Sequence, residues 1–98
     1  MEMHTIEEIS KTVSPIAESY GINRLSVFGS YARGDASSSS DIDFRIVDDG
    51  ELRGLIKLAG FCRELSESLK VPVDVLTNDA LSSDFLDRIK NEEVIIYG

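Results

Sequence analysis

Apolar side chains recur along the chain with the spacing of an α-helix in some segments and of a β-strand in others. Helical spacing predicts a first helix, which starts at a capping box formed by Thr5 and Glu8 and ends before Gly21. Pro15 interrupts this pattern, so we expect either a kink or a new helix start with Ser14 as its N-cap.

Four short segments have the character of β-strands. Residues 24–29 predict a strand that leads into a glycine, and residues 41–47 alternate strictly between polar and apolar side chains. Residues 71–77 and 93–97 predict two more strands, the first of them with Pro72 near its start, where a strand tolerates proline.

Two further helices are predicted between these strands. A long helix is expected over residues 51–69, and Ser82 or Ser83 is expected to cap a short helix that continues to about Lys90. Helices that alternate with strands predict a small sheet with helices packed on it, which is an α/β fold in a single domain spanning residues 1–98. The long helix has an apolar stripe formed by Leu52, Leu55, Leu58, Ala59, Cys62, Leu65 and Leu69.

Composition and charge narrow the classes of function. The chain of 98 residues carries 18 acidic and 10 basic residues, a net charge of −8, which disfavours direct binding to nucleic acid. A small phosphorylated ligand that arrives with metal ions is still compatible with this charge. The single cysteine, Cys62, cannot form an internal disulfide, and neither a signal peptide nor a membrane span is visible, so we expect a cytoplasmic protein.

The second predicted strand carries the first candidate for chemistry. Asp41, Asp43 and Arg45 share one face of this strand, while the apolar residues between them face the core. The Cα atoms of the two aspartates lie about 6–7 Å apart, a separation that suits two carboxylates holding one or two divalent cations. Taken alone, the same spacing is typical of the solvent-exposed face of an antiparallel sheet.

An aspartate in the third predicted strand strengthens the metal hypothesis. Asp74 lies opposite a face of three valines, and a buried carboxylate there would cost several kcal/mol unless it were paired or bound to metal. If the second and third strands are neighbours, Asp74 can join Asp41 and Asp43 in a set of three oxygen donors of the kind that magnesium prefers. The alternative is an ordinary polar residue near a strand end.

The turn after the first strand is a candidate phosphate site. Gly29 lets the backbone approach a ligand closely, and Ser30 offers a hydroxyl, although a Gly-Ser pair is also common in ordinary turns. The P-loop pattern fails because Asp35 stands where its lysine should be. A calcium-binding EF-hand loop starting at Asp35 fails because Ser40 and Ile46 replace its glycine and glutamate.

One known pattern does match. The arrangement G-S-x(10)-D-x-D, followed by one aspartate on a later strand, resembles the nucleotidyltransferase superfamily that includes DNA polymerase beta. The fuller string "GSYARGDASSSSDIDFRIV" is similar to the minimal nucleotidyltransferase (MNT) domains, which occur in prokaryotes as the antitoxins of HEPN/MNT toxin–antitoxin pairs. The resemblance covers residues 29–74 by motif and essentially the whole chain by element order. It implies the nucleotidyltransferase fold, a small mixed sheet with flanking helices.

The resemblance also implies roles for six residues. Gly29 and Ser30 would hold the terminal phosphates of the nucleotide, and Arg33, in the "ARG" segment, would help with the phosphate or with the partner. The three residues that would bind Mg²⁺ and carry catalysis are Asp41, Asp43 and Asp74.

The implied reaction is the transfer of AMP from ATP to a protein hydroxyl. Two magnesium ions would align the hydroxyl with the α-phosphate, pyrophosphate would leave, and Asp74 could accept the hydroxyl proton. In the MNT family the implied acceptor is a tyrosine of the HEPN ribonuclease toxin, which is thereby silenced.

Two alternatives stay open at this stage. The chain could be a non-catalytic antitoxin that neutralises its HEPN partner by binding alone, although clustered aspartates are not needed for occlusion. It could also be a small-molecule nucleotidyltransferase, although such enzymes usually carry a further substrate-binding domain. The sequence does not distinguish a monomer from a homo- or hetero-oligomer.

Overall fold

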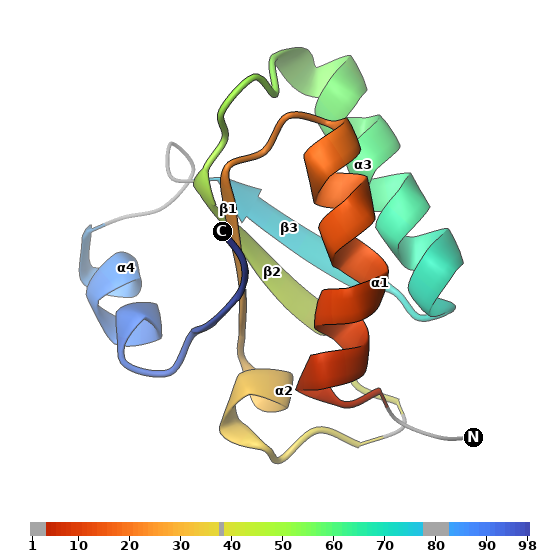
Figure 1. The fold of residues 1–98 in the computed structure, drawn as a ribbon. Helices are drawn as coiled ribbons and strands as arrows, with labels where there is room; N and C mark the ends of the chain where they lie inside the picture. The colour runs from red at the N-terminus through yellow and green to blue at the C-terminus, as the bar shows by residue number, and fades with distance from the viewer. Residues whose placement is uncertain (1–3, 38, 78–82) are drawn as a thin grey trace.

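The computed structural model describes residues 4–37, 39–77 and 83–98 of the chain. Within them, helices and strands alternate as the sequence predicts (Figure 1). In chain order the elements are α1 (Ile6–Ser19), β1 (Arg24–Phe28), α2 (Ser30–Arg33), β2 (Ile42–Asp48), α3 (Gly54–Leu69), β3 (Val73–Thr77), α4 (Ser83–Lys90) and β4 (Val94–Tyr97).

The strands form one mixed sheet in the order β3-β2-β1-β4. Strand β1 runs antiparallel to β2 and to β4, whereas β2 and β3 are parallel. The prediction of a small α/β domain with a mixed sheet and flanking helices is therefore confirmed. Because β2 and β3 are neighbours, the condition under which Asp74 can join the other two aspartates is met.

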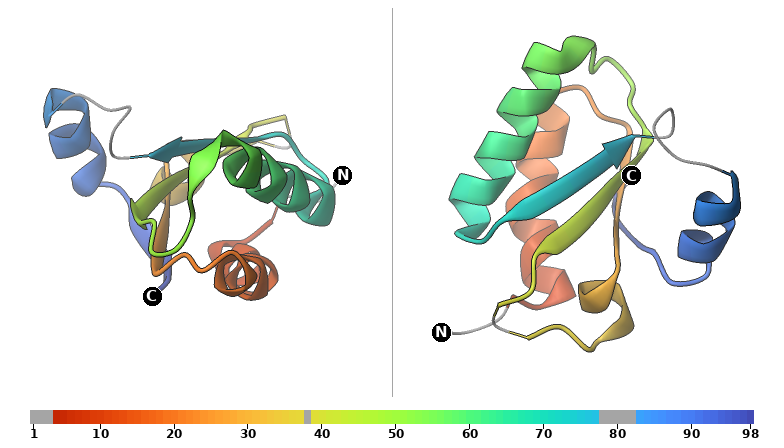
Figure 2. Two further views of the ribbon diagram at one scale, coloured as in Figure 1. Left: turned by 90° about the horizontal axis from the view of Figure 1, so that it is seen from above. Right: turned by 180° about the vertical axis from the view of Figure 1, so that it is seen from behind.

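Helices α1 and α3 cover one face of the sheet, and α4 stands on the opposite side (Figure 2). The main core lies between the sheet and helices α1 and α3. Strand β2 contributes Ile42, Phe44 and Ile46, which are buried as the alternation of its side chains predicts. This apolar layer fixes the register of β2, because a slip by one residue would exchange its two faces.

Helix α1 begins at the predicted capping box. The Thr5 hydroxyl accepts from the backbone N–H of Glu8 at 3.0 Å, and the Glu8 carboxylate accepts from the N–H of Thr5 at 3.4 Å. The helix continues through Pro15, so the prediction of a new start at Ser14 is wrong. The Ser14 hydroxyl instead donates back to the carbonyl of Ser10 at 2.6 Å. Buried side chains on both sides of the proline hold the helix on the sheet despite the missing N–H.

Helix α3 starts at Gly54, three residues later than predicted, and its buried face differs from the predicted stripe. Leu55 and the neighbouring Ile56 are 83% and 90% exposed, and Ala59 is exposed as well. The buried residues of the helix are Phe61, Leu65 and Leu69. The first turn of α3 extends beyond the ends of the strands in Figure 1, so it has no sheet beneath it to cover its apolar side chains.

The C-terminal strand is confirmed as β4, and the short helix before it as α4. Ser83 is the first residue of α4, whereas Ser82, the other predicted cap, lies outside the described residues. Within the described residues, no helix is both long and apolar enough to cross a membrane.

Candidate functional site

Three of the predicted site residues, Gly29, Asp43 and Asp74, lie along one row on the face of the sheet opposite α1 and α3. Phe28, the last residue of β1, is paired with Asp43 of β2, and Asp43 is paired with Asp74 of β3. Paired residues on neighbouring strands lie about 5 Å apart, so Asp43 and Asp74 are adjacent and Gly29 follows directly at the end of the row. Residues that are 45 positions apart in the sequence thereby face the same region.

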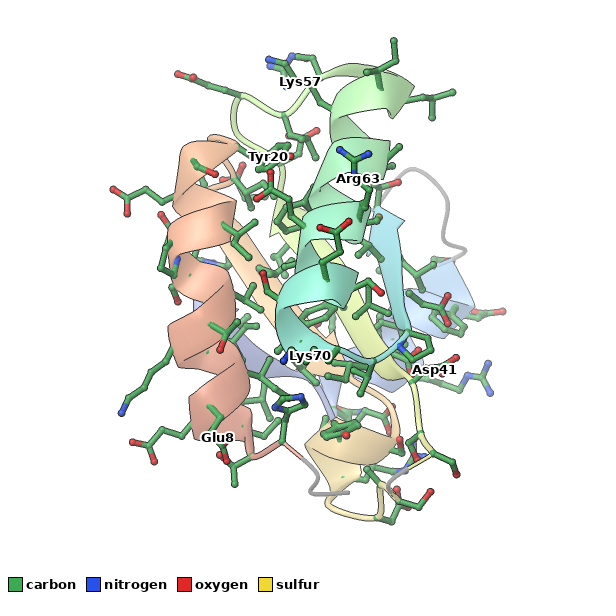
Figure 3. All side chains as sticks on the ribbon, turned by 90° about the vertical axis from the view of Figure 1, so that its right-hand side faces the viewer. Glu8, Tyr20, Asp41, Lys57, Arg63 and Lys70 are labelled. Atoms are coloured by element: carbon green, nitrogen blue, oxygen red, sulfur yellow. The ribbon has the colours of Figure 1, made fainter. Side chains whose placement is uncertain are left out.

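Asp41 lies just before β2, two residues from Asp43, at the lower right of Figure 3. Its side chain is exposed, and so is that of Asp74. The sequence argument that Asp74 is a buried carboxylate is therefore wrong. Strand β3 is an edge strand whose polar face is open to solvent, so Asp74 incurs no burial cost.

Asp43 is the aspartate whose environment is most unusual. It is partly buried, and this burial raises the pKa of its carboxyl group above the ordinary value of 3.8. The negative charges of Asp74 and then Asp41 raise the pKa further, while Arg33 opposes them. The three carboxylates are thus close enough for each charge to disfavour ionisation of Asp43, and a cation would relieve this repulsion.

The fit of these residues to a metal ion rests on the type and placement of the donors. Among the described residues, no three side chains of histidine, cysteine, aspartate or glutamate lie close enough together to hold a metal ion. Two of the three aspartates are exposed side chains that can rotate, whereas the Asp43 side chain is partly buried and lies beside Gly29. The donor set is all oxygen, which suits magnesium.

Gly29 adopts a backbone conformation that only glycine reaches easily, with φ 75° and ψ −149°. A Cβ atom at this position would overlap the carboxylate of Asp43. Glycine is therefore required for two reasons, and it lets the backbone of the Gly29–Ser30 turn lie directly beside Asp43. Ser30 begins the single turn of α2.

Arg33 ends this turn and is bracketed by two carboxylates. Its Nε donates to Asp35 at 3.2 Å, and its Nη1 donates to both carboxylate oxygens of Glu92 at 3.4 Å. These hydrogen bonds, with that to Asp35 first, raise the pKa of the guanidinium. The same Glu92 carboxylate accepts from the backbone N–H of Gly29 at 3.2 Å. Glu92 thus contacts both ends of the Gly29–Arg33 segment, which the sequence reasoning missed.

A second ion pair anchors the residue next to Glu92. Arg45 of β2 and Glu93 are both largely buried, and Nη1 of Arg45 lies 2.7 and 2.8 Å from the two Glu93 oxygens. The Ser26 hydroxyl donates to the same carboxylate at 2.8 Å. Arg45 was expected on the polar face with the aspartates, and it is there, but it is 5% exposed. In the sequence this contact corresponds to an acidic pair before the last strand and a single cation in β2, a pattern too common to predict it.

A pocket of about 320 Å³ opens beside the Gly29 turn. Its far wall is α4. The Phe85 ring packs edge-on against the Phe28 ring, with 6.1 Å between the two ring centres. The Arg88 guanidinium lies 5.6 Å from the centre of the Phe85 ring. The pocket is lined by Phe28, Gly29, Arg33, Phe85, Arg88, Ile89 and Glu92.

Comparison with known sequences assigns this arrangement to one family. The family model described as "Nucleotidyltransferase domain" matches residues 6–97. A candidate protein adenylyltransferase of Methanocaldococcus jannaschii is 43% identical over 89 residues, which cover 91% of this chain and 95% of the relative. The protein adenylyltransferase MntA of Thermococcus cleftensis is 32% identical over 100 residues, covering 98% of this chain and all of the relative.

Solved structures agree with this assignment. A candidate minimal nucleotidyltransferase is 27% identical, with a TM-score of 0.80 over 96% of this chain and 98% of its own. A Shewanella oneidensis complex of a tri-AMPylated HEPN toxin with its MNT antitoxin matches with a TM-score of 0.71 over 96% of this chain and 73% of that one. At 16% identity, this second likeness shows the fold alone.

Proposed function

Because the chain belongs to the nucleotidyltransferase domain family, we propose that it is a Mg²⁺-dependent protein adenylyltransferase, which transfers AMP from ATP to a hydroxyl group of a partner protein. The observation that carries the proposal is the row formed by Gly29, Asp43 and Asp74 across three neighbouring strands. It brings a glycine turn suited to phosphate and carboxylates suited to cations into contact.

The residues on the phosphate side of the proposed site each have a physical reason for their role. Gly29 and Ser30 would bind the terminal phosphates, because the glycine conformation opens the backbone of the turn to a ligand. Arg33 lies four residues from Gly29 and would donate to the same phosphates in place of its present contact with Glu92. The phosphate end of ATP would therefore lie against α2.

The aspartates would hold the metal. Asp41 and Asp43 would ligate magnesium from β2, and Asp74 would ligate it from the neighbouring edge strand. When bound, magnesium would neutralise charge on the triphosphate and on the attacking oxygen. The raised pKa of Asp43 fits this assignment, since the burial and repulsion that disfavour its ionised form are compensated by a cation.

The exposure of Asp74 supports a macromolecular acceptor. Because β3 is the edge strand and Asp74 is open to solvent, a hydroxyl on the surface of another protein can reach it without entering a closed pocket. Asp74 would then accept the proton that this hydroxyl loses. The acceptor we propose is a tyrosine of a HEPN ribonuclease toxin, so that the chain acts as the antitoxin by modifying its partner.

The test of this site is a double substitution, Asp41→Asn with Asp43→Asn. We expect the double variant to lose transfer of radioactive AMP to the partner while it stays folded, because the amides cannot hold the cation. The matched control, Asp48→Asn with Asp49→Asn, removes the same charge at the other end of β2 and should label normally. AMP labelling of the partner by the Asp41→Asn, Asp43→Asn variant would contradict the proposed site.

The same variants separate catalysis from occlusion. The relevant measurement is growth of cells that express the HEPN toxin together with each variant. An adenylyltransferase should lose its protective effect with Asp41→Asn and Asp43→Asn. Full protection without AMP transfer would favour the alternative, in which the antitoxin neutralises its partner by binding alone.

A further inference from the structure

The pocket between α2 and α4 already contains an anion, the carboxylate of Glu92. We propose that Glu92 occupies the position of a nucleotide phosphate, that the phosphate displaces it, and that Arg88 then contacts the polyphosphate from α4. This inference rests on the proposed function and adds to it two residues, both of which line the same pocket as Gly29.

Glu92 accepts hydrogen bonds from two donors of the Gly29–Arg33 segment. Its carboxylate accepts from the Gly29 N–H and from the Arg33 guanidinium. A backbone N–H beside a glycine together with a guanidinium is a donor set that binds phosphate oxygens as readily as carboxylate oxygens. A phosphate can replace Glu92 as the acceptor at the Gly29 N–H and at Nη1 of Arg33 only after Glu92 leaves them.

Glu92 is held less firmly than its neighbour Glu93. Its contacts with Arg33 and Gly29 measure 3.4 and 3.2 Å, longer than the roughly 2.7–2.9 Å of a strong charge-assisted hydrogen bond. Its neighbour Glu93 contacts Arg45 at 2.7 and 2.8 Å and is 11% exposed, against 28% for Glu92. Glu93 therefore fixes the chain at this point, while the Glu92 side chain can turn outward without moving the backbone.

Displacement of Glu92 would leave a positively charged pocket. With Glu92 turned away, the pocket presents the guanidinium groups of Arg33 and Arg88. Arg88 already lies over the Phe85 ring, which restrains its guanidinium at the pocket wall. Asp35, which does not line the pocket, keeps its ion pair with Arg33. Two cations on opposite walls suit a polyphosphate, which carries several negative charges along its length.

Two other roles for Glu92 make different predictions. If Glu92 were itself a metal ligand, a neutral side chain would weaken binding of magnesium-loaded nucleotide. If Glu92 only tied the turn before β4 to α2, a neutral side chain would change stability and leave ligand affinity the same. In our account the neutral side chain tightens binding, because it removes a competing anion.

The experiment uses calorimetric titration of the full chain with two probes. Tripolyphosphate without magnesium tests the pocket itself, and a non-hydrolysable ATP analogue with magnesium tests it with nucleotide. We expect Glu92→Gln to bind both about three- to tenfold more tightly, and Arg88→Gln to bind both more weakly by a similar factor. The matched controls on α4, Asp87→Asn for the anion and Lys90→Gln for the cation, should stay within about twofold of wild type.

Equal or weaker binding of tripolyphosphate by Glu92→Gln would overturn the inference, and so would no binding by either protein. The outcome is separable from that of the proposed function, since tripolyphosphate binding requires no AMP transfer. If the wild-type protein transfers AMP to its partner but Glu92→Gln binds tripolyphosphate no more tightly than wild type, only the role of Glu92 is refuted. If Glu92→Gln binds tripolyphosphate more tightly but the wild-type protein transfers no AMP, the proposed transferase function is refuted and the proposed phosphate pocket is supported.

Discussion

The two faces of the sheet differ in what they contribute, although strand β2 belongs to both. Its residues Ile42, Phe44 and Ile46 face α1 and α3 and are almost completely buried. The residues between them, Asp43 and Arg45, face the opposite side of the sheet, where Arg45 pairs with Glu93. The period of two along a strand thus separates the residues that stabilise the fold from those that form the site. Substitutions at adjacent positions should therefore have different consequences.

The largest expected effect on stability is at the core face. Phe44→Ala should lower the free energy of unfolding by about 3–5 kcal/mol, because it leaves a cavity under α1 and α3. Asp43→Asn, at the next position, should cause no such loss. Urea denaturation followed by circular dichroism measures both, and an equal loss for the two variants would contradict the division between the faces.

The next effect tests the buried ion pair on the site face. Glu93→Ala should cost about 2–4 kcal/mol, because it removes the carboxylate that neutralises the buried guanidinium of Arg45. Glu92→Ala, one residue earlier, should cost less than about 1 kcal/mol, since its ion pair with Arg33 is partly exposed. Similar losses for both glutamates in the same urea experiment would mean that Glu92 is as fixed as Glu93.

Magnesium should stabilise the folded protein through the site face alone. At ten times its dissociation constant, it should add about 1.4 kcal/mol to the free energy of unfolding, because it binds only the folded protein. The melting temperature should accordingly rise in wild type and not in the variant that carries Asp41→Asn and Asp43→Asn. A wild-type melting temperature unchanged by millimolar magnesium, with and without ATP, would count against the metal site.

The smallest effect is the pH dependence that Asp43 introduces. Because folding raises the pKa of its carboxyl group, the folded state binds this proton more tightly than the unfolded state. The contribution of Asp43 to stability is therefore fully present below the ordinary pKa of its carboxyl group, 3.8, and is lost as the pH rises through the raised pKa of the folded state. Asp43→Asn should be more stable than wild type above that range, by less than about 1 kcal/mol after solvent screening. Urea denaturation across pH 3.5–8 gives the difference, and a difference that does not change with pH would refute the account.

Local patterns were enough to predict most of the fold. The capping box at Thr5 and Glu8 and the alternation of β2 depend on residues close in sequence, and both are confirmed. The exposed start of α3 was not predictable in this way, because Leu55 and Ile56 have the spacing of a buried stripe. Whether a helix turn lies over the sheet depends on where the strands end, which local spacing does not encode.

The candidate site shows the same limit. The motif that contains Gly29 and Asp43 could be read from the sequence, and the register of the sheet adds that Asp74 lies next to Asp43. The contacts of Glu92 and Glu93 could not be read, since their partners Arg33 and Arg45 lie 59 and 48 residues away. Acidic residues before a strand are common, and only the antiparallel pairing of β4 with β1 brings this pair to the site.

The most direct test of the central claim is the mass of the proposed HEPN partner after incubation with this protein, ATP and magnesium. The account predicts a mass increase of one or more AMP groups on a tyrosine, dependent on magnesium and absent with the variant that carries Asp41→Asn and Asp43→Asn. An unmodified partner, under conditions in which the wild-type protein is folded and binds ATP, would contradict it.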